Sequence, residues 1–144
     1  MPATNSARHV VATVDMRLMA ANGGSAEVST EFRYSTKDPF AVQATFSRPA
    51  HTPVVWVFAR DLLLAGASRH AGAGDVQIYP SGDAIVFDLN SPEGSARLVA
   101  SATAIRSFVS RVVSLVGPGE EQHFVDIDAE LESLSRSIFA GGEA

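Results

Sequence analysis

Histidine is the residue type in this sequence best suited to acid–base catalysis or to metal binding, because its imidazole titrates near neutral pH. The chain has four histidines, His9, His51, His70 and His123, and no cysteine. No two of them stand at the helical spacing of a zinc site, and none belongs to a His-Glu-x-x-His pattern. Each falls in an expected loop or at the edge of a strand. We therefore predict solvated histidines, no metal site and no catalytic residue.

Acidic residues gather near the C-terminus, at Asp126, Asp128 and Glu130, where they could bind a cation. Acids at the start of a helix also stabilise the positive end of its dipole, and no loop of oxygen ligands surrounds these, so we favour a helix start. Two glycine-rich stretches, Gly72-Ala73-Gly74 and Gly117-Pro118-Gly119, lack the other residues of dinucleotide-binding and phosphate-binding loops. The sequence predicts no cofactor and no enzyme.

The charge of the chain disfavours nucleic acid as a partner. Its net charge is −5, and Lys37 is the only lysine, so most basic side chains are arginines scattered among acids. A phosphate-binding surface needs a basic stripe. Several aromatic residues could stack on bases, but they fall on apolar faces of predicted strands, where core packing explains them better. These residues are Phe32, Tyr34, Phe40, Phe46, Trp56 and Phe58.

Length and hydropathy are those of one globular domain, and the absence of cysteine is compatible with the cytoplasm. A chain of 144 residues fits a single domain, and no apolar run approaches the ~20 residues that span a bilayer. The N-terminal residues include no apolar segment of the kind found in signal peptides. We predict one domain over residues 1–144, with a core of about 9–139, a flexible N-terminal arm, a flexible C-terminal tail and no membrane insertion.

Seven segments have the patterns expected of β-strands. The first two alternate apolar and polar residues around Ala21-Asn22-Gly23-Gly24, which predicts a hairpin. Two later segments, 54–58 and 84–89, are apolar without alternation, which predicts strands buried on both faces. The predicted strands are 9–18, 26–34, 40–46, 54–58, 75–79, 84–89 and 95–100.

Three further segments favour helices. Residues 59–65 are helix formers, with Gly66 as the expected C-cap. Ser101 is a good N-cap for a second helix, whose apolar residues recur at helical spacing. A third helix begins at Asp126 or Asp128. We therefore predict an α+β fold of about seven mostly antiparallel strands in twisted sheets, with a short central helix and two C-terminal helices.

Residues 56–64 change from strand to helix propensity without a linker and hold the only tryptophan, Trp56. We expect this segment to be the seam between two β-rich halves, with Trp56 in the core. Arg60 and Asp61 are charged residues beside the apolar segment, which makes them candidate partner-contact residues. The alternative is an intramolecular ion pair that fixes the start of the helix.

Five short motifs occur in a recognisable order. They are Phe32-Arg33-Tyr34 with Asp38-Pro39-Phe40-Ala41-Val42; Val55-Trp56-Val57-Phe58-Ala59-Arg60-Asp61-Leu62-Leu63; Gly72-Ala73-Gly74-Asp75-Val76; Ser91-Pro92-Glu93-Gly94; and Asp126-Ile127-Asp128-Ala129-Glu130-Leu131. In this order and spacing, over roughly residues 10–135, the sequence resembles the SsgA-like family of sporulation-specific cell-division proteins of actinomycetes.

The resemblance implies a small cytoplasmic protein without enzymatic activity, from a filamentous actinomycete. It also implies a Whirly-like fold assembled into a bell-shaped homotrimer. The best-known member of the family helps to place the tubulin-like GTPase FtsZ at future septum sites. The expected partners are therefore FtsZ, SsgA-like paralogues and further copies of the chain, at division septa.

We thus expect a non-catalytic regulator or adaptor for sporulation septation that helps to localise or control FtsZ through protein–protein contacts. The alternative is a single-stranded nucleic-acid-binding module, which the Whirly-like fold suggests and the charge disfavours. A small-ligand-binding β domain has no supporting residue in the sequence and would need a large polar-lined pocket.

Overall fold

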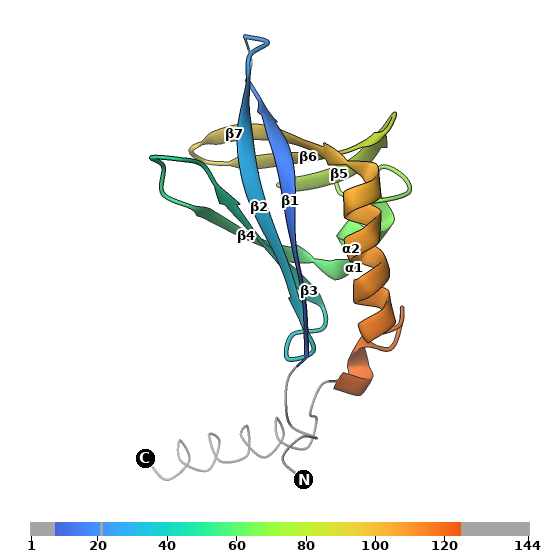
Figure 1. The fold of residues 1–144 in the computed structure, drawn as a ribbon. Helices are drawn as coiled ribbons and strands as arrows, with labels where there is room; N and C mark the ends of the chain where they lie inside the picture. Colours follow the sequence, from blue (N-terminus) through green and yellow to red (C-terminus); the bar gives the residue numbers. More distant parts are fainter. Residues whose placement is uncertain (1–7, 21, 125–144) are drawn as a thin grey trace, which may run out of the picture.

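The computed structural model describes residues 8–20 and 22–124, which form one curled antiparallel sheet with two α-helices (Figure 1). The strands are β1 (His9–Met19), β2 (Ser25–Ser35), β3 (Ala41–Ser47), β4 (Val54–Ala59), β5 (Val76–Ser81), β6 (Ala84–Ser91) and β7 (Gly94–Ser101). Their order in the sheet is β4-β3-β2-β1-β7-β6-β5. The α+β class is confirmed, but the strands form one sheet rather than several.

β1 is the strand that joins the two halves of the sheet. Its whole length pairs with β2, and residues 16–19 also pair with residues 97–100 of β7. The predicted seam at residues 56–64 is therefore wrong in part, because β4 lies at an edge of the sheet. The helix that follows β4 does connect the halves, since α1 (Arg60–Gly66) packs against β5.

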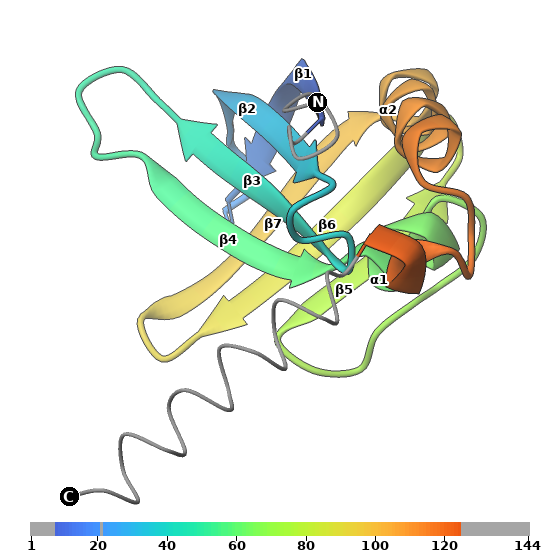
Figure 2. The same ribbon diagram turned by 90° about the horizontal axis from the view of Figure 1, so that it is seen from below.

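The core fills the concave face of the sheet, and α2 (Ala102–Leu115) covers one end of that face (Figure 2). Phe32 of β2 is fully buried at its centre. The Phe32 ring centroid lies 5.5 Å from that of Phe108 in α2 and 5.8 Å from that of Phe87 in β6. Ser101 caps α2 as predicted, because its Oγ accepts a hydrogen bond of 3.3 Å from the Ala104 amide.

The end of α1 lies so close to β5 that it requires glycine. A Cβ on Gly66 would collide with the side chain of Ile78. Gly66 is the last residue of the helix and Ala67 is the C-cap, so the cap was predicted one residue early. Close approach to the neighbouring strand, rather than a capping conformation, explains this glycine.

Two predictions about strand burial are wrong. Residues 54–58 were expected to be buried on both faces, but Val55 is 54% exposed and Val57 is 60% exposed, because β3 is the one described strand that pairs with β4. Phe40 was expected on the inner face of a strand, but β3 begins at Ala41 and Phe40 is half exposed. The corresponding prediction for β6 is confirmed at residues 85–87, which are buried.

The described chain ends in a short 3₁₀ helix, η2 (Glu121–Phe124). The predicted final helix beginning at Asp126 or Asp128 lies outside the described residues, as does the last of the five motifs. Most of the predicted N-terminal arm and the predicted C-terminal tail lie outside them too. Within residues 8–20 and 22–124, no helix is both long and apolar enough to cross a membrane.

Candidate functional site

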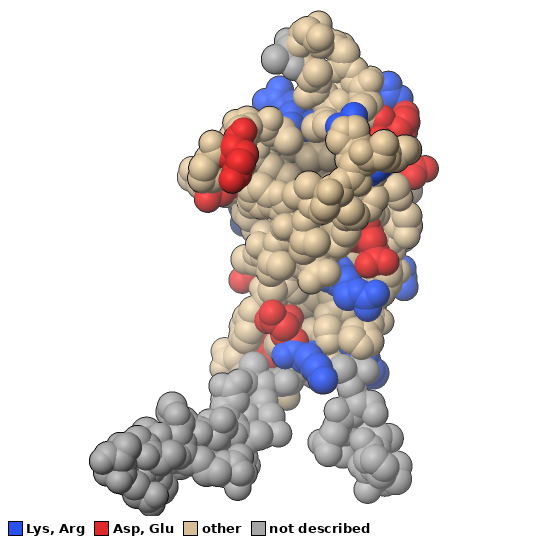
Figure 3. All heavy atoms as spheres, turned by 90° about the vertical axis from the view of Figure 1, so that its left-hand side faces the viewer, with Lys and Arg blue, Asp and Glu red and all other residues tan. Residues whose placement is uncertain are grey.

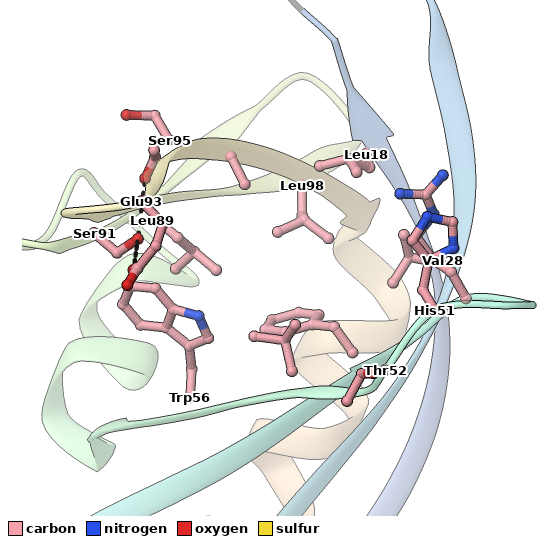
Figure 4. A pocket seen from close by; sticks show the side chains of 15 residues that line it. Leu18, Val28, His51, Thr52, Trp56, Leu89, Ser91, Glu93, Ser95 and Leu98 are labelled. Atoms are coloured by element: carbon pink, nitrogen blue, oxygen red, sulfur yellow. Dashed lines mark hydrogen bonds between the residues drawn. The ribbon is translucent and has the colours of Figure 1, made fainter.

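An apolar pocket of about 360 Å³ lies at the end of the concave face that α2 does not cover (Figure 4). Side chains of six strands converge on it. The apolar residues that line it are Leu18, Val28, Phe46, Val54, Trp56, Leu89, Ala96 and Leu98. The pocket can accommodate an apolar group, and the lining offers little to bind a polar one.

The pocket exists because the apolar pattern of the strands continues past the end of the helix that covers them. On β1, Met16 is buried, whereas the next inner-face residue, Leu18, is only partly buried and borders the pocket. On β4, Phe58 is buried, whereas Trp56 is partly buried and borders the pocket. The same alternation thus forms core at one end and pocket wall at the other.

Polar side chains form the rim of the pocket. One side comes from the loop between β3 and β4 and includes Arg48 and His51. His51 Nδ1 lies 2.9 Å from the Pro49 carbonyl oxygen, within hydrogen-bond distance. The other side is the β6–β7 turn, which includes Ser91, Ser95 and the Glu93 carboxylate. The small-ligand hypothesis required a polar-lined pocket, and this one is polar only at its rim.

The hydroxyl groups of the turn are occupied within the turn. Ser91 Oγ lies 3.2 Å from both a Glu93 carboxylate oxygen and the Gly94 carbonyl oxygen. Ser95 Oγ donates a hydrogen bond of 2.6 Å to Asn90 Oδ1. These bonds hold the hairpin turn in shape and leave the apolar wall below it as the surface available to a ligand or a partner.

β4 borders the pocket and is an open edge of the sheet. The Arg60 amide donates a hydrogen bond of 2.8 Å to the Phe40 carbonyl oxygen, which continues the ladder between β3 and β4. Because bonded and non-bonded pairs alternate along an antiparallel ladder, the N–H and C=O groups of Val55 and Val57 point away from β3. Their backbone groups face the free edge.

The surface around this edge is mostly apolar. Val54, Val55 and Val57 are 51%, 54% and 60% exposed, and β4 contains no charged residue. Seen from this side, the molecule is hollowed in its upper half, and charged side chains stand around the hollow rather than in it (Figure 3). An apolar surface on an edge strand is typical of an interaction site.

Arg60, a predicted partner-contact residue, is instead fully buried, so that prediction is wrong for the single chain. Its Nη1 donates a hydrogen bond of 3.0 Å to Tyr34 Oη, and its Nε lies 3.2 Å from a carboxylate oxygen of Glu121. Tyr34 in turn donates a hydrogen bond of 2.9 Å to the Pro39 carbonyl oxygen. The alternative reading, an ion pair that fixes the helix start, is confirmed with Glu121 as the acid.

Burial of this network changes the chemistry of Tyr34. Desolvation raises the pKa of its hydroxyl, and the neighbouring Arg60 charge opposes that rise. Through the contacts of Arg60 with Tyr34 and with Glu121, this network connects β2, the start of α1 and η2. Asp61, the other predicted contact residue, is exposed, and its contact with a partner stays a prediction.

A polar cluster lies on the surface of β5, β6 and β7. Asp88 accepts hydrogen bonds of 2.8 and 3.1 Å from Arg97 and one of 3.0 Å from Tyr79. The bonds from Arg97 are the main cause of a lowered Asp88 pKa, to which the Tyr79 bond also contributes. The His70 ring stacks on Tyr79 at a centroid distance of 5.3 Å. This cluster holds neighbouring strands together.

The prediction that His9, His51, His70 and His123 are exposed to solvent is confirmed. They lie far apart along the described chain, and within it no group of three or more metal-binding side chains is found. Of the aromatic residues considered as a stacking platform, Phe32, Tyr34, Phe46 and Phe58 are buried in the core, as the packing interpretation predicted.

The sequence patterns predict neither the pocket nor the position of β4 at an edge of the sheet. The uninterrupted apolar run of β4 predicts burial on both faces, whereas the strand lies at an edge. Pro49 and Pro53, which precede the strand, are a signal that could have indicated an edge, because proline cannot donate to a ladder. The position of β4 in the sheet is set by pairings with strands distant in sequence, and the local pattern does not contain it.

Comparison with known proteins places the chain in a family. The family described as Streptomyces sporulation and cell division protein, SsgA, matches residues 28–121. The sporulation-specific cell division protein SsgB of Streptomyces coelicolor is 45% identical over 123 residues, which cover 83% of this chain and 90% of that protein.

Two solved structures share the fold. One, from work on SsgB mutations that correlate to longitudinal cell division during sporulation of Streptomyces coelicolor, has a TM-score of 0.78 at 41% identity and covers 83% of this chain and 97% of its own. The other, an SsgA-like sporulation-specific cell division protein from Thermobifida fusca, has a TM-score of 0.80 at 35% identity and covers 89% and 96%. These matches confirm the resemblance seen in the motifs: the chain belongs to the SsgA family of sporulation and cell division proteins.

Proposed function

We propose that this chain is a non-catalytic regulator of sporulation-specific cell division that acts in the cytoplasm, at division septa, by binding other proteins. The observation that carries the proposal is the 45% identity to a sporulation-specific cell division protein over 90% of that protein's length. Similarity over 83% of this chain reflects more than one shared motif.

The described surface supports a binding role. The pocket and the β4 edge are apolar and border each other, and they offer contact area to a partner. Arg60 and Glu121, a buried ion pair of the described chain, face each other within the fold and leave the surface to other residues. The proposed partners are FtsZ, which the chain would help to localise or control at septum sites, and SsgA-like paralogues.

The test of the cellular role is complementation. The chain is expressed in Streptomyces coelicolor that lacks its own SsgB, with SsgB from the same promoter as the control, and sporulation septa are counted by fluorescence microscopy. We expect septa to return. A chain that accumulates to the level of the control and restores none would contradict the proposal.

The partner is tested separately. Co-sedimentation of the purified chain with assembled FtsZ, with and without an SsgA-like paralogue, should enrich the chain in the pellet in at least one case. If it stays in the supernatant in both, FtsZ is not its partner.

We also propose that the chain forms the Whirly-like homotrimer that the family resemblance implies. Light scattering at micromolar concentration should then give a mass near three times the 15.2 kDa of one chain. A stable monomer would remove the trimer from the proposal.

A further inference from the structure

We infer that the β4 edge binds an extended segment of a protein partner as an added strand, with apolar side chains of that segment in the adjacent pocket. The inference deepens the proposed function and rests on it in two respects, that the chain acts by binding another protein and that its own assembly is a trimer. It adds where the partner binds and what the bound segment must look like. Addition of a strand to a sheet edge is an established mode of peptide recognition, in which main-chain hydrogen bonds provide affinity and pockets for alternate side chains provide specificity.

The backbone of β4 provides the first half of such a site. The N–H and C=O groups of Val55 and Val57 point away from β3, so an incoming strand can bond to them without breaking any bond of the sheet. The opposite edge is different, because Ala71 already pairs with Ile78 of β5. Within the described residues, β4 is therefore the edge that offers its ladder to a partner.

The pocket provides the second half. Val54 and Trp56 are alternate residues of β4, and both line it. Side chains of an added strand that point to the same face would project into the space between β4 and the β6–β7 turn, where the pocket opens (Figure 4). Its volume of about 360 Å³ is at the low end of the ~300–1,000 Å³ of ligand pockets. It therefore has room for side chains but not for a folded element.

Charges beyond the two ends of β4 predict which end of an antiparallel segment is basic and which is acidic. β4 contains no charged residue, but Arg48 lies near its start and the exposed Asp61 lies just beyond its end. Antiparallel pairs outnumber parallel ones. An antiparallel segment ends beside Arg48 and begins beside Asp61. We therefore expect a basic residue, then apolar residues at alternate positions, then an acidic residue.

A second copy of β4 would present a similar order of charges, so self-pairing needs to be weighed. Pairing of two identical antiparallel edges creates a two-fold axis and hence a dimer. A dimer does not fit the homotrimer proposed above. We therefore assign the edge to a segment of a different protein, and the self-paired dimer becomes an outcome that the experiment can detect.

The experiment uses the full chain and a short synthetic peptide that begins with lysine, alternates valine with threonine and ends with glutamate. Binding is followed by the fluorescence of Trp56, which lines the pocket and is the only tryptophan, and by the anisotropy of a dye on the peptide. We expect saturable binding with a change in both signals. A peptide of the same composition with its valines contiguous should bind roughly tenfold more weakly or worse, and so should one N-methylated at alternate amides.

The matched protein variants are Val57→Pro and Val57→Thr. The Val57 amide faces the free edge, so proline removes a donor that the sheet does not use, and edge strands tolerate proline there. We expect Val57→Pro to melt near the wild-type temperature and to lose roughly tenfold or more in affinity. Val57→Thr keeps the amide and should lose less. If Val57→Pro fails to fold, the N-methylated peptide makes the same test on the unaltered chain.

Several results would overturn the inference. These are equal binding of the alternating and contiguous peptides, wild-type affinity in a folded Val57→Pro variant, and no signal up to millimolar peptide. A dimer that Val57→Pro dissociates would assign the edge to a second copy. Palmitate that changes Trp56 fluorescence while the peptide does not bind would assign the pocket to a lipid. The peptide assay uses purified protein, so it can fail while complementation succeeds, and it can succeed while complementation fails. The two proposals are therefore judged separately.

Discussion

The two edges of the sheet are protected to different degrees. At β5, Ala71 and Ile78 exchange backbone hydrogen bonds of 2.8 and 3.0 Å, and Pro80 removes a donor farther along the strand. β4 contains no proline and no charge, no described residue adds a bridge to its free side, and its valines are exposed. Unprotected apolar edges are a liability for solubility. An edge left in this state beside a pocket is best explained by a partner that covers it.

The same contrast holds between the two ends of the concave face. Phe32, under α2, is fully buried and contacts two other rings, whereas Trp56, beyond the reach of α2, forms a pocket wall. One end of the face is filled by the chain itself. The other has apolar walls without an occupant among the described residues.

The largest predicted effect is a difference in the free energy of unfolding between substitutions at the two ends of the concave face. Phe32→Ala should lower the free energy of unfolding by about 4 kcal/mol, because it empties the centre of the core. Trp56→Ala should cost about 2 kcal/mol, less than the ~3–5 kcal/mol of a fully buried aromatic residue, because part of its ring is already in contact with solvent. Urea unfolding measures both. Equal losses would mean that Trp56 is as well covered in solution as Phe32.

The buried ion pair tests what holds the start of α1. Arg60→Met should cost about 3 kcal/mol, because it leaves the Glu121 carboxylate buried without its cation. The double variant with Glu121→Gln should recover part of that loss. Asp61→Asn, next to it but exposed, should change stability by less than about 0.5 kcal/mol. Urea unfolding of the set checks the order, and an Arg60→Met variant as stable as wild type would remove the network from the account.

At the β5 edge, the contact between the end of α1 and β5 should not tolerate a larger side chain at Gly66. Gly66→Ala should destabilise the protein by about 1–3 kcal/mol, because its methyl group meets Ile78. Gly74→Ala is the matched control, since a Cβ there meets nothing within 4 Å, and it should be close to neutral. Thermal melts of the two variants compare them directly. If both melt alike, α1 and β5 are packed more loosely than the structure indicates.

The smallest effect should depend on pH. Hydrogen bonds from Arg97 lower the Asp88 pKa in the folded state, so the stabilisation that Asp88 provides is present above its unfolded pKa of about 3.9 and is lost as pH falls through the folded value. Asp88→Asn should therefore melt below wild type at pH 7. The gap in melting temperature should shrink in strong acid. A gap that is unchanged at low pH would show that the carboxylate charge is not its cause.

Much of the fold could be predicted because residues close together in the sequence determine it. The alternation of β1 and β2, the turn between them and the Ser101 cap depend on neighbouring residues, and the structure shows each of them. The order of the strands does not depend on neighbours. β4 and β6 both read as continuous apolar runs, yet β6 lies between two strands and β4 lies at an edge.

The candidate site was harder to predict for the same reason. Arg60 is buried because Tyr34 and Glu121 approach it from distant parts of the chain, and its own neighbours suggested a surface position. The pocket forms where strands extend past α2, which depends on where the helix crosses the sheet. Trp56 could be recognised as important from the sequence, but its position on a pocket wall could not.

Amide hydrogen exchange, resolved by residue with NMR, tests most directly whether the β4 edge is free. In the full chain without peptide, the amides of Val55 and Val57 should exchange quickly, whereas that of Ile78, bonded to Ala71, should exchange slowly. Addition of the alternating peptide should slow exchange at Val55 and Val57. Amides of Val55 and Val57 as protected as that of Ile78 before any peptide is added would contradict the account, because the edge would then be covered already.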